Sequence, residues 1–355
     1  MIDAIVTEEL TRIFKTYVLK GYYESGWEHG GVFLYNIWKR LRAEKTIVQA
    51  LKGINLRVRE GEFVFLVGPN GSGKTTLIRI LATFLLPTSG KAVVAGYDVT
   101  HQKREVLKNI SYIPSLLAGA AWAHVGLTVG ENLKIMARLF GYSEKTLDEA
   151  LRTLEIEDLK NRVFGSLSTG QQARVVLALG IIKNAPIFLL DEPTLGLSPE
   201  AVRIVLDYLK YLNEKMKVTI LYATHHLMEA QKMADRVVFL KDGTILVDGD
   251  PKSIIRSVRI TETIILEIHH AYFDIGKVLH EIEDRCIFTN AELLESETGE
   301  YVVKLGVKDS GEVLPEIIHK LVSRGSRIKN VKVLEPSLED AFMYYAKRCP
   351  GNAEI

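Results

Sequence analysis

A glycine-rich segment between a strand and a helix constrains this chain more than any other feature. Residues 68–75 read Gly-Pro-Asn-Gly-Ser-Gly-Lys-Thr, which fits G-x-x-x-x-G-K-[ST] in full. The apolar run Glu62–Val67 before it is typical of a buried strand, and Thr75–Leu86 after it has helical spacing up to Pro87. Glycines let successive backbone N–H groups point into one concavity, and a helix N-terminus adds its positive end. The pattern therefore predicts a cradle for phosphate groups.

The cradle predicts a nucleotide and a metal ion. We expect Lys74 to reach the β- and γ-phosphates and the Thr75 hydroxyl to hold Mg²⁺, so that ATP and Mg²⁺ are the predicted cofactors. The predicted nucleotide-binding residues of this segment are Gly68, Pro69, Asn70, Gly71, Ser72, Gly73, Lys74, Thr75 and Thr76.

Two further strand ends carry side chains suited to phosphate hydrolysis. The apolar run Ile187–Leu190 ends in Asp191, which we expect to bind Mg²⁺, and Glu192, which we expect to orient and deprotonate a water molecule. His225 follows the apolar run Val218–Ala223 and Thr224, where the carboxyl end of a parallel strand faces the ligand crevice. Its imidazole is the predicted contact to the γ-phosphate. The neighbouring His226 is the competing candidate, and His225 is favoured by its position.

Alternating strand and helix signals predict an α/β sheet domain with a helical insertion between two strands. We place this domain at residues 1–252, with an insertion at 18–49 and the helical subdomain at 111–183. Beyond a boundary near residues 253–262, the signals follow a βαββαβ order. That order predicts a C-terminal α+β module of the ferredoxin-like kind at residues 260–349.

Composition excludes several classes of protein. Lys plus Arg number 45 and Asp plus Glu number 44, a net charge of +1, so no overall field attracts nucleic acid, and we predict no nucleic-acid partner. Two cysteines, Cys286 and Cys349, are too few for a disulfide framework and are expected to be reduced thiols. Residues 109–130 carry no Asp, Glu, Lys or Arg, but Pro114 and three glycines interrupt them, so we predict no membrane span there.

A short segment at residues 167–171 decides between families that share the phosphate loop. It reads Leu-Ser-Thr-Gly-Gln, and Ser168 with Gln171 forms the pattern of a capping box before an apolar helix. Lying before the Asp191 strand, it is similar to the L-S-G-G-Q signature of the ABC-transporter ATPase family, with Thr169 in place of one glycine. The chain thus resembles a P-loop ABC-type ATPase over about residues 5–250.

The resemblance implies an assembly. In this family two cassettes pack head to tail, so that Ser168, Gly170 and Gln171 would contact the nucleotide held by the other subunit. The implied partners are a second copy of the chain or a homologous cassette, and a separate transmembrane permease. The implied location is the cytoplasmic face of the cell membrane, where the chain would be a peripheral subunit.

Three further positions are read through the resemblance. Tyr17 resembles the aromatic residue that stacks on adenine, although a core aromatic at a strand end is the alternative interpretation. Ser115 stands where the family has a metal-linked glutamine, so it is a predicted metal contact with a shorter reach. Ser198 replaces the aspartate that usually ends the loop Leu195–Ser198.

Two segments point to an exporter. The insertion places one apolar helical face beside basic residues over residues 32–45, a pattern that predicts contact with a membrane surface or a partner helix, or packing on its own domain. That face consists of Phe33, Leu34, Ile37, Trp38 and Leu41. Residues 335–342 read Glu-Pro-Ser-Leu-Glu-Asp-Ala-Phe and resemble an ending found in the exporter branch of the family.

The sequence predicts the ATP-binding and ATP-hydrolysing subunit of an ABC-type membrane exporter, which dimerises on ATP to drive the permease. One alternative is a soluble ABC ATPase acting on nucleic acid or ribosomes. Another is a regulatory ATP-binding module with little turnover, suggested by Ser115 and Ser198.

Overall fold

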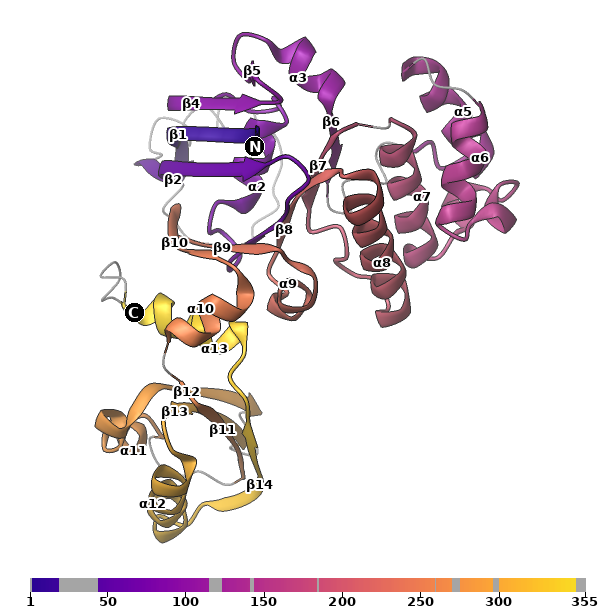
Figure 1. Cartoon of the computed structure of the whole chain (residues 1–355). Helices are drawn as coiled ribbons and strands as arrows, with labels where there is room; N and C mark the ends of the chain where they lie inside the picture. Colours follow the sequence, from indigo (N-terminus) through magenta and orange to yellow (C-terminus); the bar gives the residue numbers. More distant parts are fainter. Residues whose placement is uncertain are drawn as a thin grey trace, which may run out of the picture. The chain divides into compact units, whose positions relative to one another are not determined.

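The chain forms two compact units in its computed structural model (Figure 1). The structure describes residues 2–18, 44–114, 123–140, 144–183, 185–258, 260–269, 275–295 and 300–348. The first unit holds residues 1–62, 68–224 and 240–245, and the second holds residues 63–67, 225–239 and 246–355.

A six-stranded sheet of order β10-β9-β3-β8-β7-β6 carries the strands expected from the apolar runs. Its members are β3 (Phe63–Val67), β6 (Ile110–Ile113), β7 (Ile187–Asp191), β8 (Thr219–Thr224), β9 (Arg236–Lys241) and β10 (Thr244–Gly249). The pairs β3–β9, β6–β7 and β7–β8 are parallel. Every residue of β3, β7 and β8 is buried, as continuous apolar runs require when both faces of a sheet are covered.

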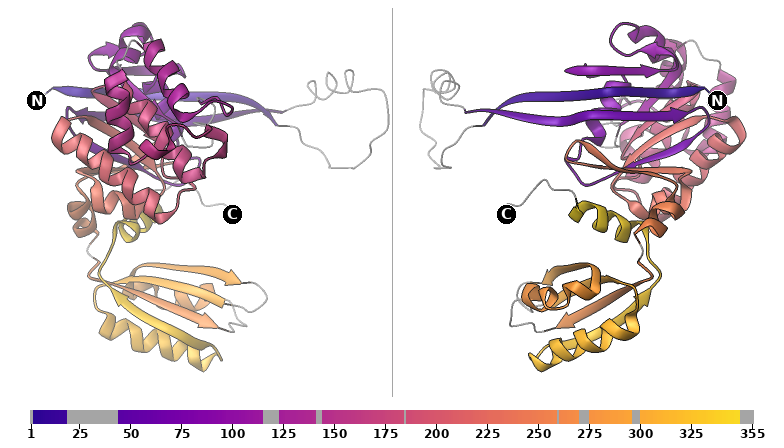
Figure 2. Two further views of the ribbon diagram at one scale, coloured as in Figure 1. Left: turned by 90° about the vertical axis from the view of Figure 1, so that its right-hand side faces the viewer. Right: turned by 60° about the vertical axis from the view of Figure 1, so that its left-hand side comes forward.

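A second sheet contains the N-terminal hairpin. Its order is β2-β1-β4-β5, with β1 at Asp3–Val18, β2 at Glu44–Arg59, β4 at Ser89–Val94 and β5 at Tyr97–Asp98. The antiparallel pair β1–β2 forms a long ribbon that extends past the other strands (Figure 2). Both ends of the insertion predicted at residues 18–49 are therefore strand, because the β1–β2 ladder continues to the pair Val18 and Glu44. The predicted apolar helical face lies outside the described residues.

Helices of the first unit fall into two sets. The first set lies among the strands and consists of α2 (Lys74–Leu81) and α3 (Lys103–Asn109). The second set lies together to the right of β7 in Figure 1 and consists of α5 (Val129–Phe140), α6 (Glu144–Thr153), α7 (Thr169–Ile182) and α8 (Pro199–Met216). Among the described residues of the predicted helical subdomain at 111–183, the first helix begins at Val129, and residues 111–113 belong to β6. The helix predicted to reach Leu86 ends at Leu81, because Thr83 takes a left-handed backbone conformation with φ of 64°. None of the described helices combines the length and apolarity that a membrane span needs.

A βαββαβ module occupies most of the second unit. Its elements in order are β11 (Glu262–His269), α11 (Ile275–His280), η4 (Glu283–Arg285), β12 (Cys286–Glu295), β13 (Glu300–Val307), α12 (Ser310–Ser323) and β14 (Arg327–Leu334). The strand order is β12-β13-β11-β14, and all three pairings are antiparallel. Val278 of α11 and Ile317 of α12 are buried in one apolar core with Leu266 of β11 and Leu305 of β13.

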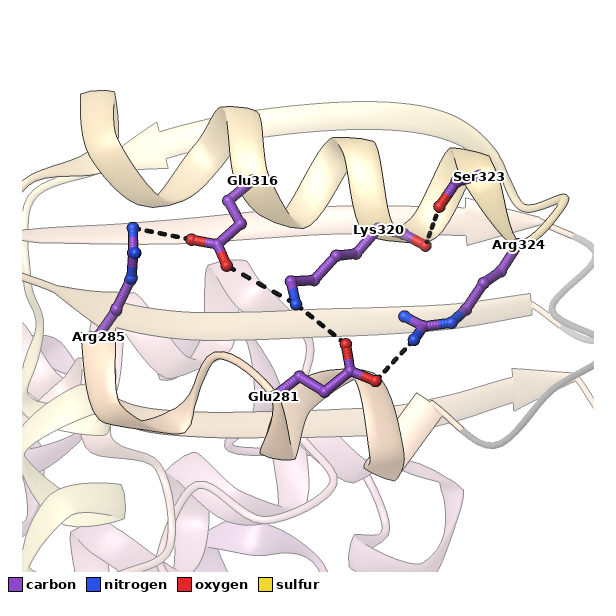
Figure 3. Close-up of polar contacts among 6 residues, drawn as sticks. All are labelled: Glu281, Arg285, Glu316, Lys320, Ser323 and Arg324. Atoms are coloured by element: carbon purple, nitrogen blue, oxygen red, sulfur yellow. Dashed lines mark hydrogen bonds and ion pairs between the residues drawn. The ribbon is translucent and has the colours of Figure 1, made fainter.

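A network of ion pairs, called here the ladder of charged side chains, lies on the helical surface of this module (Figure 3). Glu281 accepts from Lys320 at 3.0 Å and from Arg324 at 2.6 Å. Glu316 pairs with Arg285 at 2.9 Å and lies 3.7 Å from Lys320. The two basic partners of Glu281 lower the pKa of its carboxyl group. The ladder links the segment after α11 to α12.

The last helix, which the sequence places at the end of the C-terminal module, also packs against helices that precede that module. Helix α13 (Leu338–Arg348) packs against α9 (Leu227–Met233) and α10 (Pro251–Ser257) within the second unit. The Phe342 ring meets the Phe239 ring edge-on at 5.3 Å, and Leu338 N donates to Gln231 Oε1 at 2.9 Å. The physical reason is the apolar face of α13, on which Leu338 and Ala341 are fully buried.

Candidate nucleotide-binding site

The glycine-rich loop runs from β3 to α2 as predicted, and its shape depends on two glycines. A Cβ on Gly68 would lie 2.0 Å from the Leu240 carbonyl oxygen, so no larger residue fits. Gly73, which caps α2, has φ of 109° and would place a Cβ 2.6 Å from the Ala50 carbonyl oxygen. Only glycine adopts that backbone conformation without strain. The loop therefore approaches the backbone of Ala50 and Leu240 closely, which only glycine allows at these two positions.

A cavity of about 300 Å³ opens at the loop. Its lining residues are Ala50, Asn70, Gly71, Ser72, Gly73, Lys74, Thr75, Thr76 and Glu192. The structure thus gathers seven of the nine loop residues predicted from the sequence around one cavity, together with the predicted water-activating glutamate. Gly68 and Pro69 contribute through their carbonyl oxygens, which accept from the Lys74 ammonium at 2.6 and 3.1 Å.

Lys74 and Glu192 share the buried floor of this site. Lys74 is 5% exposed, and its Nζ lies 3.6 Å from Glu192 Oε1. Burial lowers the pKa of Lys74, and the charges of Glu192 and Asp191 work in the opposite direction. Because phosphate oxygens are also anionic, the same ammonium is placed to bind them.

The predicted magnesium ligands lie next to each other. The Thr75 hydroxyl donates to Asp191 Oδ1 at 3.0 Å, and Asp191 is 5% exposed. Burial raises the pKa of Asp191, whereas the Thr75 hydrogen bond lowers it. A hydroxyl and a carboxylate oxygen at this separation are donors of the kind that Mg²⁺ prefers, with water and phosphate oxygens completing the shell. These residues fit the ion. Ser115, the third predicted metal contact, lies outside the described residues.

Glu192 has an unusual backbone. Its φ is 52°, in the left-handed region, and its amide donates to the Ala223 carbonyl oxygen of β8 at 2.9 Å. A non-glycine residue in this conformation costs about 1–3 kcal/mol and persists only where its surroundings impose it.

His225 follows β8 directly and is half-buried, whereas His226 is exposed and caps α9. The two imidazole rings contact each other, with centroids 4.0 Å apart. Burial therefore favours His225 over its neighbour as the interior histidine.

The signature segment forms the capped N-terminus of α7. Ser168 N donates to Gln171 Oε1 at 3.0 Å, and Gln171 N donates to Ser168 Oγ at 3.3 Å, so the predicted capping box is present. Ser168 is exposed and Gly170 is half-exposed. Free N–H groups at such a tip attract anions. The tip belongs to the helices beyond β7 and is not part of the cavity wall described above (Figure 1). Ser198 caps α8, its side chain accepting from Ala201 N.

Comparison with known proteins assigns the family. The ABC transporter family matches residues 51–195. The daunorubicin resistance ATP-binding protein DrrA2 of Streptomyces coeruleorubidus is 32% identical over 313 residues, 86% of this chain and 93% of the relative. The chain belongs to the ABC transporter ATP-binding proteins. The ABC transporter ATP-binding protein NatA of Bacillus subtilis is 31% identical over 225 residues, 62% of this chain and 90% of the relative.

A solved ABC cassette supports the same fold and activity. The ATP-binding cassette MJ0796, in a dimeric post-hydrolysis state bound to ADP and Pi, is 27% identical, with a TM-score of 0.54, over 69% of this chain and 98% of that chain. This ABC transporter ATP-binding protein is thus a P-loop ATP hydrolase with a helical insertion, and the fold class predicted for the ATPase is confirmed.

A second aromatic residue of β1, Phe14, pairs nearer to the cavity residue Ala50 than Tyr17 does. The backbone of Tyr17 pairs with Lys45, five residues before the cavity residue Ala50, which is about 17 Å along an extended strand. Phe14 pairs with Val48, two residues from Ala50, and the Arg12 guanidinium lies 4.7 Å from its ring centroid. The ladder shifts register between Arg12 and Ile13. A register shift of this kind leaves no clear signal in the sequence. The sequence alone therefore does not predict which residue of β2 pairs with Phe14.

Proposed function

We propose that this chain is the ATP-hydrolysing subunit of an ABC-type membrane exporter and that it dimerises on ATP to drive a separate permease. The observation that supports the dimer is the capped N-terminus of α7, where Ser168 is exposed and Gly170 half-exposed. A helix N-terminus of this kind attracts anions, and these residues do not line the cavity at the phosphate loop. A helix N-terminus in this position can contact the phosphates of a nucleotide bound by another cassette. The second cassette is a copy of this chain or a close relative.

The export direction rests on the extent of the similarity. The daunorubicin resistance relative covers 86% of this chain, including most of the second unit. A spermidine/putrescine import ATP-binding protein from Oleidesulfovibrio alaskensis is 35% identical but covers only 58% of this chain. A Nod factor export ATP-binding protein from Rhizobium is 33% identical over 61%. We infer an ATPase domain over residues 1–252 and an accessory module over residues 260–349, at the cytoplasmic face of the membrane.

Each of the site residues has a proposed role in ATP hydrolysis. Lys74 and the loop amides bind the β- and γ-phosphates, and Glu192 orients and deprotonates the attacking water. Mg²⁺, held by Thr75 and Asp191, would neutralise charge on the phosphates. His225 would hydrogen-bond the γ-phosphate.

The β1–β2 register supports a proposal for the residue that binds the base. We propose that Phe14 rather than Tyr17 stacks on adenine, because Phe14 lies nearer to Ala50 along the ribbon.

The test is the composition of the complex that this chain forms in its native cells. A tagged chain extracted in mild detergent should copurify a polytopic membrane protein in a fixed ratio, and the purified complex should hydrolyse ATP. Recovery with ribosomes or RNA, together with RNA-stimulated hydrolysis and no membrane protein, would reject the exporter assignment. A chain that binds ATP but releases no phosphate would instead be a regulatory module.

A further inference from the structure

Two buried hydroxyl groups, those of Tyr222 and Thr194, meet beside the turn that begins at Glu192. Tyr222 lies in the centre of β8 and is fully buried, and its hydroxyl oxygen lies 2.9 Å from Thr194 Oγ1. Thr194 is only 3% exposed. A phenolic hydroxyl inside an apolar sheet is costly unless it is hydrogen-bonded, so this contact fixes both side chains.

Thr194 belongs to the turn that begins at Glu192. Leu195 N donates to the Glu192 carbonyl oxygen at 3.2 Å, and Leu197 N donates to the Thr194 carbonyl oxygen at 3.1 Å. At the start of the turn, Glu192 N donates to the carbonyl oxygen of Ala223, the residue after Tyr222. Strand β8 therefore holds the turn at two points, once through its backbone and once through the Tyr222 side chain.

This double attachment accounts for the strained backbone of Glu192. Its left-handed conformation needs surroundings that impose it, and the two contacts to β8 bracket the residue from both sides. The direction of the Glu192 side chain toward Lys74 depends on that backbone angle. A small rotation of the turn would move the carboxylate away from the water it has to orient, and an error of about 1 Å can cost about 100-fold in rate.

We propose that Tyr222 and Thr194 are positioning residues for ATP hydrolysis, which act by holding the turn that aims Glu192 into the phosphate cavity. This inference rests on the proposed role of Glu192 as the water-activating residue. Since the cavity wall is formed by the phosphate loop, the start of α2, Ala50 and Glu192, the pair acts through Glu192 and not on the nucleotide. The expected signature is a loss of kcat with little change in ATP affinity.

The test uses single variants, a double variant and a conservative variant of the purified chain. Tyr222→Phe and Thr194→Val should each lower kcat by about 10- to 100-fold while the Kd for ATP stays within about twofold. The double variant should resemble either single variant, because the two residues act as one unit. Thr194→Ser, which keeps the hydroxyl, should restore most of the rate.

A matched control separates positioning from stability. Tyr208 of α8 is also a largely buried tyrosine, and Tyr208→Phe should leave kcat unchanged. Wild-type kcat in both Tyr222→Phe and Thr194→Val would overturn the proposal, as would an equal loss of kcat in Tyr208→Phe. Retained hydrolysis in Glu192→Gln would refute the proposed role of Glu192 itself. The Tyr222 and Thr194 variants test only whether these two residues position Glu192, so the two failures can be told apart.

Discussion

Lys74 Nζ lies 3.6 Å from Glu192 Oε1, so the proposed phosphate-binding cation and the proposed water-activating carboxylate are neighbours in the cavity wall. Lys74 also donates to the carbonyl oxygens of Gly68 and Pro69, which hold its side chain in place. The cation is therefore pre-positioned for a phosphate oxygen, and binding requires little further ordering of its side chain.

Replacing the lysine should abolish tight nucleotide binding. Lys74→Met removes a charge-assisted contact to phosphate, and ATP affinity measured by titration calorimetry should fall about 10- to 100-fold. Lys183→Met is the matched control, because burial also lowers the pKa of Lys183, which donates to the Leu107 carbonyl oxygen. Equal affinity in wild type and Lys74→Met would contradict the assignment of the phosphate site.

The adenine site should respond to Phe14 rather than to Tyr17. Loss of one aromatic stacking partner costs about 1–3 kcal/mol, so Phe14→Ala should weaken ATP binding by about 5- to 150-fold. Tyr17→Ala should bind as the wild type does. Affinity for triphosphate without a base should be the same in both variants. A loss confined to Tyr17→Ala would instead restore the assignment made from the sequence.

The insertion should affect membrane attachment and not the nucleotide site. Replacing Phe33, Ile37 and Trp38 with Ser removes the apolar face predicted from the sequence, so recovery of the chain in the membrane fraction should fall. ATP affinity should stay unchanged. The control is Lys15→Ser, which changes an exposed residue of β1 and should leave membrane recovery unchanged. Unaltered membrane recovery in the triple variant would reject this role.

Cys286 should be a slow nucleophile in the folded chain. Burial, with smaller effects of Glu316 and Glu283, raises the pKa of its thiol to about 11. Only the thiolate reacts, so in a Cys349→Ser background alkylation at pH 8 should be about 10²-fold slower than in urea. The rate should rise about tenfold per pH unit until the pH approaches the raised pKa. Rapid alkylation of the native chain at pH 8, followed by mass spectrometry, would contradict this environment.

Much of the site was predictable because each motif is contiguous. The phosphate loop needs one strand, one turn and one helix in succession, and its glycines define the turn by their lack of a side chain. The turn between β9 and β10 is also local, because the pair Asp242-Gly243 favours the positive φ values, 49° and 77°, that the structure gives these residues.

The rest depends on contacts between segments far apart in the chain. The left-handed backbone of Glu192 is imposed by Ala223 and, through Thr194, by Tyr222, and no local pattern reveals either contact. The shift of register between Arg12 and Ile13 decides which aromatic lies nearest to Ala50. The docking of α13 on α9 similarly depends on the tertiary fit of an apolar face that a secondary-structure pattern does not assign to a partner.

The transporter role depends most on the proposal that two cassettes form a dimer with ATP bound between them. Glu192→Gln keeps the side-chain shape but removes the charge that activates water, so ATP should bind without being hydrolysed. At saturating Mg-ATP, light scattering of this variant should give twice the mass of the chain, and a second change, Ser168→Arg, should return it to a monomer. A Glu192→Gln chain that binds ATP yet remains monomeric under these conditions would contradict the account.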